Sequence, residues 1–370
     1  MSARDLGDLL DESLAAEDVG LEGDATPPFV FTPPAQPTPL VISFPHVGLE
    51  WPEDFARPRP QVNFGRNADY EVHQLYNNAP ALGAACVQAR YTRLLIDLNR
   101  APDDVSPSLV PEHPDPRPRQ TDASSRGMTI PNRGVVWDTA VGNIPILVPP
   151  LSLTEFENRL ARFYWPYHRA VELLLARRIA HFGHAILLEA HSMPGSVPGD
   201  LILGTLEGGS CAPGLERAAL EALRQATEPV TNRLDVRLND PYRGGELVRR
   251  FGRPEHGVHA LQIEVNRSLY MDEKTLTLWL PSSAGSAKRL GSSASAAARG
   301  ASRLGLLRAR LEEVVRLLAT PRGAWEGAPG RASRSGTQPS STRSLVSPVR
   351  ERINSRTVMG DAKERTRGSE

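Results

Sequence analysis

The stretch Leu187-Leu-Glu-Ala-His-Ser-Met-Pro194 constrains the fold most, because an apolar run ends there in ionisable side chains. Alternation along a strand places Glu189 and His191 on one face, at the strand's carboxyl end. Residues 152–183 before it form the clearest helical region, and Gly183 is a typical stop for a helix. A helix followed at once by a buried strand is half of a βαβ unit. The sequence therefore predicts an α/β fold, a single domain with a central mixed, mostly parallel sheet flanked by helices.

Three other strand-like segments, residues 41–46, 94–100 and 260–267, also end in reactive side chains. In open α/β sheets the carboxyl ends of the strands are where ligands bind, so we expect these side chains to gather at one edge of the sheet. Together with the first stretch they supply two histidines, several carboxylates and two Asn-Arg pairs. That inventory suits a hydrolytic metal site better than a structural core.

Composition sets the expected boundaries and partners. The formal net charge of the 370 residues is zero, which favours neither nucleic acid nor a membrane as a partner. Residues 1–24 nevertheless carry eight acidic residues and one Arg, and residues 281–370 carry 17 basic and seven acidic residues. Both ends are poor in aromatics, which is typical of disorder. We predict a disordered acidic, Pro-rich segment (1–39), a catalytic domain (40–281), a linker with an amphipathic helix (282–320) and a disordered basic tail (321–370).

The two cysteines, Cys86 and Cys211, are far apart in sequence, so free thiols in a reducing compartment are expected rather than a disulfide. The acidic N-terminus lacks the apolar run of a secretory signal. No segment approaches the roughly 18 apolar residues of a membrane span. We therefore expect a cytoplasmic protein with a small-molecule partner, either a monomer or a homo-oligomer.

Two histidines are candidate metal ligands. His46 lies at a strand corner in Phe44-Pro-His-Val-Gly48, where the glycine allows close approach of a substrate. A lone histidine is more often a satisfied polar residue. His191 is the stronger candidate, because a buried histidine beside a glutamate needs a compensating partner. Glu50 and Asp69 follow His46 in the chain, and each is either a further ligand or a surface carboxylate.

Glu264 is a candidate general base. It shares one face of its predicted strand with Gln262 and Asn266, while the opposite face is apolar. A strand exposed to water on one side would show the same alternation. An Asn-Arg pair follows Glu264 directly, however, and a carboxylate in such a site can accept a proton from a substrate or water.

Asp97 and Asn99 share a face of another predicted strand, which Arg100 follows. The planar fork of an arginine suits recognition of a carboxylate, and a structural ion pair is the alternative interpretation. The sequence lacks a His-Glu-x-x-His helix, a dinucleotide-binding fingerprint, a phosphate-binding glycine loop and a nucleophile elbow. These absences disfavour the corresponding enzyme classes.

Seven motifs occur in order along the chain: Phe44-Pro-His-Val-Gly48, Arg93-Leu-Leu-Ile-Asp-Leu-Asn-Arg100, Pro166-Tyr-His168, Gly183-His184, Glu189-Ala-His-Ser-Met-Pro194, Asn239-Asp-Pro-Tyr-Arg-Gly-Gly245 and His259-Ala-Leu-Gln-Ile-Glu-Val-Asn-Arg267-Ser-Leu-Tyr-Met-Asp-Glu273. In this order they resemble the N-formylglutamate amidohydrolase family over about residues 40–280. Because that family is related in fold to zinc carboxypeptidases, the resemblance implies a zinc-exopeptidase (phosphorylase-hydrolase-like) architecture.

The resemblance implies zinc (Zn2+) held by His46 and His191, with Asp69 as the expected third ligand and Glu50 as the alternative. It implies that Glu264 is the general base and acid. The chain departs from the family pattern elsewhere: Val47 replaces a small residue, Glu189 and His73 each replace an Asp, and Leu49 occupies the position of a carboxypeptidase ligand.

The resemblance also implies substrate-binding side chains. Arg100, with Asn99, would hold a substrate carboxylate, Arg93 matches a recurrent family arginine, and Arg249 is a candidate reader of a second carboxylate. The expected activity is zinc-dependent hydrolysis of a small N-acyl amino acid, with N-formyl-L-glutamate as the leading substrate. A carboxypeptidase-like peptidase acting on short or cell-wall peptides, and a non-catalytic binding protein of the same fold, are the alternatives.

Overall fold

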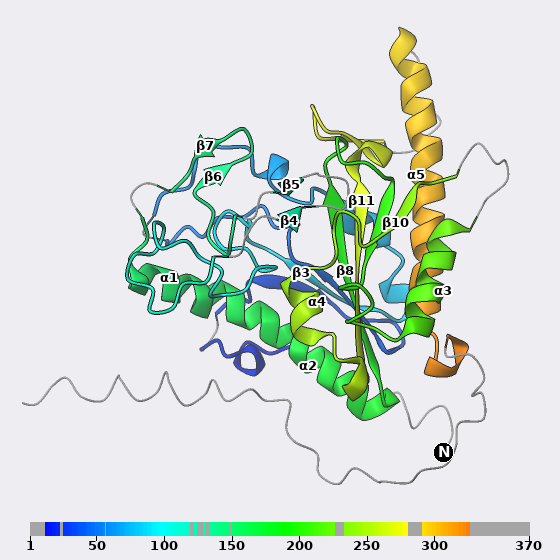
Figure 1. The fold of residues 1–370 in the computed structure, drawn as a ribbon, viewed down its shortest axis with the longest axis horizontal. Helices are drawn as coiled ribbons and strands as arrows, with labels where there is room; N and C mark the ends of the chain where they lie inside the picture. Colours follow the sequence, from blue (N-terminus) through cyan, green and yellow to red (C-terminus); the bar gives the residue numbers. More distant parts are fainter. Residues whose placement is uncertain are drawn as a thin grey trace, which may run out of the picture. The chain divides into compact units, whose positions relative to one another are not determined.

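A seven-stranded mixed sheet forms the centre of the part of the chain that the structure describes (Figure 1). This structure is a computed structural model, and it describes residues 12–22, 25–55, 57–118, 122–123, 129–130, 133–147, 150–225, 233–279 and 291–325. The strand order is β1-β3-β2-β8-β11-β9-β10. The strands are β1 (Phe29–Thr32), β2 (Leu40–Phe44), β3 (Ala85–Ala89), β8 (Ala185–Met193), β9 (Leu201–Gly204), β10 (Val236–Leu238) and β11 (Val258–Asn266).

Four neighbouring strands, β3, β2, β8 and β11, run parallel to one another. The edge strand β1 is antiparallel to β3, and β9 is antiparallel to β11 but parallel to β10. The predicted mixed, mostly parallel sheet is therefore confirmed. Short two-stranded ribbons lie outside the main sheet: β4 (Asp122–Ala123) with β5 (Thr129–Ile130), β6 (Thr139–Ala140) with β7 (Ile144–Pro145), and β12 (Met271–Asp272) with β13 (Thr277–Leu278).

Helices cover both faces of the sheet (Figure 1). Alternate residues of β8 serve the two faces: Ile186 and Leu188 pack on the side of α3 and α5, while Ala185 and Leu187 pack on the side of α2 and α4. A strand buried on both sides reads as a continuous apolar run, which explains the sequence of β8. The helices are α1 (Leu153–Arg159), α2 (Trp165–Phe182), α3 (Pro213–Arg224), α4 (Glu246–Phe251) and α5 (Gly291–Leu318), with a π-helical turn at Leu160–Tyr164.

The helical region predicted over residues 152–183 is present. Ser152 Oγ accepts a hydrogen bond from the Glu155 backbone N–H at 3.2 Å and caps α1, and Gly183 ends α2 at a φ of 75°. Each is a normal chemical signal for a helix end. None of the helices in the described ranges is both long and apolar enough to span a membrane.

The segment 94–100 is not a strand, and this prediction was wrong. It forms turns in which the carboxylate of Asp97 accepts a hydrogen bond from the Asn99 backbone N–H at 2.9 Å. An aspartate that bonds the backbone two residues ahead stabilises a turn rather than an extended strand. The fully buried Asp97 carboxylate therefore shapes this segment more than its apolar neighbours do.

The ordered fold also begins earlier than the predicted boundary at residue 40. Strand β1 pairs with β3, and Phe29 is buried against the α2 side of the sheet. Upstream, Glu12 forms an ion pair with the buried Arg178 at 2.9 Å. The buried Phe29 and the ion pair of Glu12 thus attach this N-terminal segment to the rest of the fold. Residues 1–11 lie outside the described residues.

The C-terminal part of the fold extends past the predicted boundary at residue 320. The apolar stripe predicted at Leu304–Leu318 lies in α5 and packs beside α3. Beyond α5, Trp325 is 5% exposed and packs edge-on against His259, with ring centroids 5.1 Å apart. The assignment of 321–325 to a disordered tail was therefore wrong. Residues 280–290 and 326–370, which include the rest of that tail, lie outside the described residues.

We expect Trp325→Ala to lower the free energy of unfolding by about 3–5 kcal/mol, because it empties a buried aromatic site. Trp325→Phe keeps most of the packing and should cost much less. Chemical denaturation of the two variants beside the unmodified protein checks this. An unchanged denaturation midpoint for Trp325→Ala would show that the packing of Trp325 contributes nothing to stability.

Candidate active site

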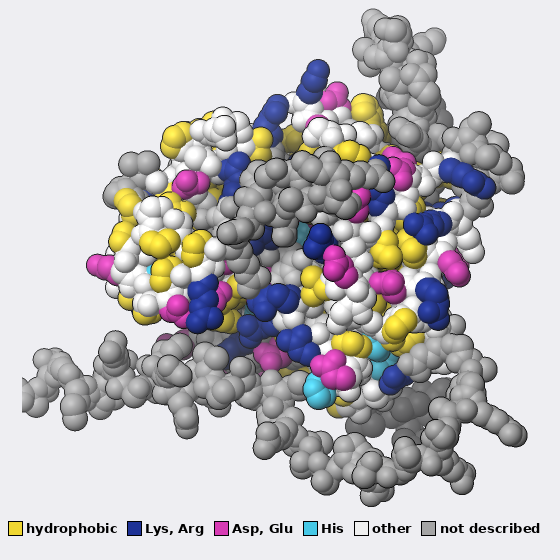
Figure 2. Space-filling view, viewed as in Figure 1, with side chains coloured by type: hydrophobic (Ala, Val, Ile, Leu, Met, Phe, Trp, Pro, Cys, Tyr) yellow, Lys and Arg dark blue, Asp and Glu magenta, His cyan; other side chains and the backbone are white. Residues whose placement is uncertain are grey.

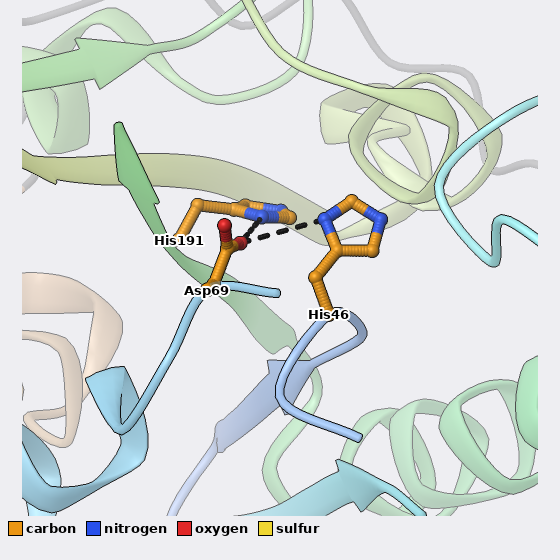
Figure 3. A group of neighbouring side chains, drawn as sticks. All are labelled: His46, Asp69 and His191. Carbon is orange, nitrogen blue, oxygen red and sulfur yellow. Dashed lines mark hydrogen bonds and ion pairs between the residues drawn. The ribbon is translucent and has the colours of Figure 1, made fainter. Parts of the chain in front are cut away.

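Three buried side chains, His46, Asp69 and His191, converge at the carboxyl ends of the central strands (Figure 3). His46 follows β2, His191 lies in β8, and Asp69 comes from the loop between β2 and β3. Asp69 Oδ2 lies 2.8 Å from His191 Nδ1 and 3.4 Å from His46 Nδ1. Within the described residues this is the one group of three potential metal ligands whose donor atoms all lie within 4.8 Å of one another.

The second nitrogen of each imidazole is held by a carboxylate. His46 Nε2 lies 2.8 Å from Asp97 Oδ1, and His191 Nε2 lies 3.2 Å from Glu189 Oε1. Carboxylates that hold one ring nitrogen orient the other toward a metal, and this arrangement is usual around protein metal sites. His46 Nδ1 is buried, and its contact with Asp69 Oδ2 at 3.4 Å is an ion-pair contact rather than a hydrogen bond. The donor set and the position of this ring nitrogen fit a divalent cation.

The two histidines and Asp69 change one another's pKa values. Burial alone would raise the pKa of Asp69, but the hydrogen bond from His191 and the adjacent ring of His46 hold this pKa well below its usual range. Burial opposes protonation of His191, yet hydrogen bonds to Asp69 and Glu189 raise its pKa well above the usual range. The positively charged form of His191 is therefore favoured beside the side chains of Asp69 and Glu189. A metal cation can supply that charge instead.

Glu264 lies beside His191 on the neighbouring parallel strand, where the two residues are register partners. It is 8% exposed, and its Oε1 accepts a hydrogen bond from Gln262 Nε2 at 2.9 Å. Burial raises the pKa of Glu264 to about 7, and Asp69 adds to the rise while His191 opposes it. A carboxylate with such a pKa can both accept and return a proton near neutral pH. Every residue of β11 is buried, so a strand with one face in water is excluded.

Asp97 links the cluster to an arginine and a tryptophan. Its Oδ2 accepts hydrogen bonds from Arg93 Nη2 at 2.6 Å and from Trp137 Nε1 at 3.2 Å, while Oδ1 faces His46. The structural ion pair considered for this segment is thus formed by Asp97 with Arg93. It lies directly behind the first histidine.

Both the oxygen and the nitrogen of the Asn99 side-chain amide contact other residues of the protein. Its Oδ1 accepts from the Leu247 backbone N–H at 3.0 Å, and its Nδ2 lies 3.1 Å from His191 Nε2. These contacts favour positioning of His191 and of the start of α4 over direct contact with a substrate. Arg100 is partly buried, and its Nη1 donates to the Asn99 carbonyl at 2.8 Å.

Two of the predicted site residues lie apart from the histidines. Glu50 pairs with Arg90 at 3.3 Å, and its side chain is 57% exposed. The geometry therefore brings Asp69, and not Glu50, to the histidine pair. Arg249 pairs with Glu246 on α4, and its side chain is 48% exposed. Lys and Arg side chains gather on the face of the molecule that α4 occupies in the same view (Figure 2).

Arg267 is a site residue that the sequence reasoning did not assign. Its Nη2 lies 3.3 Å from Asp69 Oδ1, and its Nε donates to Ser192 Oγ at 3.0 Å. It therefore holds the oxygen of Asp69 that points away from His191. The available signal was the Asn-Arg pair that follows Glu264 at the end of β11.

The chain is similar in sequence to proteins of known family. A family model described as N-formylglutamate amidohydrolase matches residues 38–271. An N-formylglutamate deformylase of Pseudomonas aeruginosa is 34% identical over 253 residues, covering 64% of this chain and 83% of the relative. One of Pseudomonas putida is 32% identical over 251 residues, covering 64% and 82%.

A solved structure is similar as well. The crystal structure of an N-formylglutamate amidohydrolase from Ralstonia eutropha matches with a TM-score of 0.59 and 30% identity, covering 79% of this chain and 99% of that chain. The family match covers more than half of the residues, and the two deformylases are matched over most of their length. The chain is therefore an amidohydrolase and belongs to the N-formylglutamate amidohydrolase family.

Proposed function

We propose that the protein is a zinc-dependent deformylase that hydrolyses N-formyl-L-glutamate to formate and glutamate. The names of the two Pseudomonas relatives support this substrate. The observation that carries the proposal is the buried His46–Asp69–His191 group with Glu264 beside it on the next strand. A proton acceptor next to a metal-binding group is the minimum that metal-assisted amide hydrolysis needs.

His46, Asp69 and His191 would hold the zinc. Two histidines and a carboxylate are a usual ligand set for catalytic zinc and leave a position open for water or substrate. A bound zinc ion supplies Lewis acidity, which lowers the pKa of water and polarises the formyl carbonyl. Asp97 and Glu189 would fix the two rings so that each Nδ1 points into the site.

Glu264 would move the proton in both halves of the reaction. It removes a proton from the attacking water as the water oxygen bonds to the formyl carbon. It then delivers that proton to the glutamate nitrogen as the carbon–nitrogen bond breaks, and formate leaves. The pKa of about 7 that burial gives to Glu264 suits both steps.

Arg100 would hold the α-carboxylate of the substrate. We expect Arg100→Lys to lower kcat/KM for N-formyl-L-glutamate by on the order of 10-fold or more, because lysine keeps the charge and loses the two-pronged donor geometry. A substrate analogue with an amidated α-carboxylate should lose far less. Steady-state kinetics on both compounds checks this. Equal losses would mean that Arg100 supports the fold, and Arg93 would be the next variant to measure.

A substrate screen tests the proposed function directly. N-formyl-L-glutamate, other N-acyl amino acids and short peptides are compared by release of free amine. The proposal requires N-formyl-L-glutamate to have the highest kcat/KM. Faster cleavage of peptides would instead support a carboxypeptidase-like activity, and no cleavage of any compound would support a binding protein.

The buried, free thiols of Cys86 and Cys211 support a reducing compartment, and we propose the cytoplasm as the location.

A further inference from the structure

Two arginines lie against one tryptophan next to the candidate active site. The guanidinium carbons of Arg93 and Arg133 lie 4.6 Å and 4.9 Å from the centroid of the Trp137 ring. Arg93 is paired with Asp97. Arg133 has no carboxylate within ion-pair distance in the part of the chain that the structure describes. Asp97 thus pairs with Arg93, while Asp138 acts on Arg133 only from beyond ion-pair distance.

Arg133 is held in a fixed direction. Its Nη1 donates to Thr139 Oγ1 at 2.8 Å and also to the Thr139 carbonyl. These hydrogen bonds use one nitrogen of the fork, and within the described residues Nε and Nη2 have no hydrogen-bond acceptor. Partial burial lowers the pKa of Arg133, Asp138 opposes this shift, and the charge of Arg93 adds to it. An anion bound here would relieve both the desolvation and the repulsion.

The arginine pair is connected to the reacting groups through Asp97. One oxygen of Asp97 holds His46 Nε2, and the other accepts from Arg93 and Trp137. The charge of Arg93 also acts on the carboxylate of Glu264. Arg93 therefore lies on the His46 side of the site, with Asp97 between it and the histidine, and Arg133 shares the Trp137 ring with Arg93.

We propose that Arg133, together with Arg93, forms a carboxylate-binding subsite that recognises the side-chain carboxylate of the substrate. This inference rests on the proposed deformylase function and extends it to specificity. A guanidinium that is half-buried, oriented and not neutralised is well suited to bind a carboxylate. Arg249, the earlier candidate for this role, is neutralised by Glu246 and nearly half exposed.

The test compares N-formyl-L-glutamate with N-formyl-L-glutamine, in which a neutral amide replaces the side-chain carboxylate. In the full-length, metal-containing protein, Arg133→Gln should lower kcat/KM for N-formyl-L-glutamate by on the order of 10-fold or more, because a charge-assisted hydrogen bond is lost. It should change kcat/KM for N-formyl-L-glutamine by less than about 2-fold, because no charge-assisted bond to a neutral amide is lost. Arg133→Lys should be intermediate on the glutamate substrate.

Arg59→Gln is the matched control, since Arg59 also lies over an aromatic ring, 4.6 Å from the Phe64 centroid, and is exposed. It should leave the ratio of the two kcat/KM values unchanged. An equal loss on both substrates for Arg133→Gln, or no loss on either, would overturn the subsite.

The binding of glutarate and butyrate, measured by calorimetry, tests the subsite independently of hydrolysis. The dicarboxylate glutarate should bind at least 10-fold more weakly to Arg133→Gln, while the monocarboxylate butyrate should show no such difference. If glutarate binding depends on Arg133 in a protein that does not hydrolyse N-formyl-L-glutamate, the subsite stands and the proposed function fails. If the protein hydrolyses N-formyl-L-glutamate, but replacing Arg133 changes neither the ratio of the two kcat/KM values nor the affinity for glutarate, the function stands and the subsite fails.

Discussion

Replacing Glu264 by glutamine is expected to lower kcat by about 10²–10⁴-fold, the usual contribution of a general base. Glutamine keeps the shape of the side chain and still accepts a hydrogen bond from Gln262, but it cannot take a proton from water. Metal content and thermal stability should stay close to those of the unmodified protein. Steady-state kinetics with elemental analysis on the same sample checks both expectations.

The matched control for this variant is Glu155→Gln, which makes the same change at a carboxylate paired with Arg57 and Arg159, remote in sequence from the site. It should keep nearly normal kcat. A near-normal kcat for Glu264→Gln would show that Glu264 is structural. Glu189, which also contacts His191, would then be the next carboxylate to test as the base.

The pH dependence of the reaction should follow the same carboxylate. Glu264 must be ionised to accept a proton, and burial raises its pKa to about 7. A bound cation favours the ionised form, so the acid limb of kcat/KM should fall at or below pH 7. On that limb kcat/KM should rise about tenfold for each pH unit, as expected for one ionising group. Residual activity of Glu264→Gln should lack this limb.

Replacing His191 by alanine is expected to abolish metal binding and activity together. His191 supplies one of three convergent donor atoms in a buried group, so its loss leaves only two side chains to bind the metal. Loss of a residue that merely orients a metal ligand typically costs about 10–100-fold in metal affinity, and loss of a ligand should cost more. Metal content after dialysis and the rate of formate release measure the two effects.

His73→Ala is the control for the histidine variant, because His73 faces Glu71 at 3.7 Å and is not part of the cluster. It should keep its metal. Circular dichroism of His191→Ala distinguishes loss of the site from loss of the fold. A folded His191→Ala protein with full metal content and activity would contradict the assignment of His191 as a ligand.

Periodicity in the sequence was sufficient to predict the scaffold. The apolar run that becomes β8 and the alternation in β11 each reflect a single local pattern, and both strands are present. The helix before β8 was predictable from its cap and its final glycine, because these signals act within one turn. The register of β8 and β11 then brings together the side chains near the ends of these strands, namely Glu189, His191 and Glu264.

Residues in loops were harder to predict because tertiary contacts place them. Asp69 reaches the histidines through the loop between β2 and β3, and nothing in its local pattern separates it from Glu50. Asp97 turns its own segment by bonding the backbone, which apolar periodicity does not reveal. Arg133 acquires its position only through Trp137 and Thr139, two contacts that the sequence does not specify.

Zinc readdition with formate release as the readout tests the central claim most directly. The protein is stripped with a chelator, zinc is added back in steps, and the initial rate of formate release from N-formyl-L-glutamate is measured at each step. The site at His46, Asp69 and His191 predicts no rate without metal and a linear rise that ends at one zinc per chain. A rate that is unaffected by removal of the metal, or no formate release at any zinc level, would contradict the account.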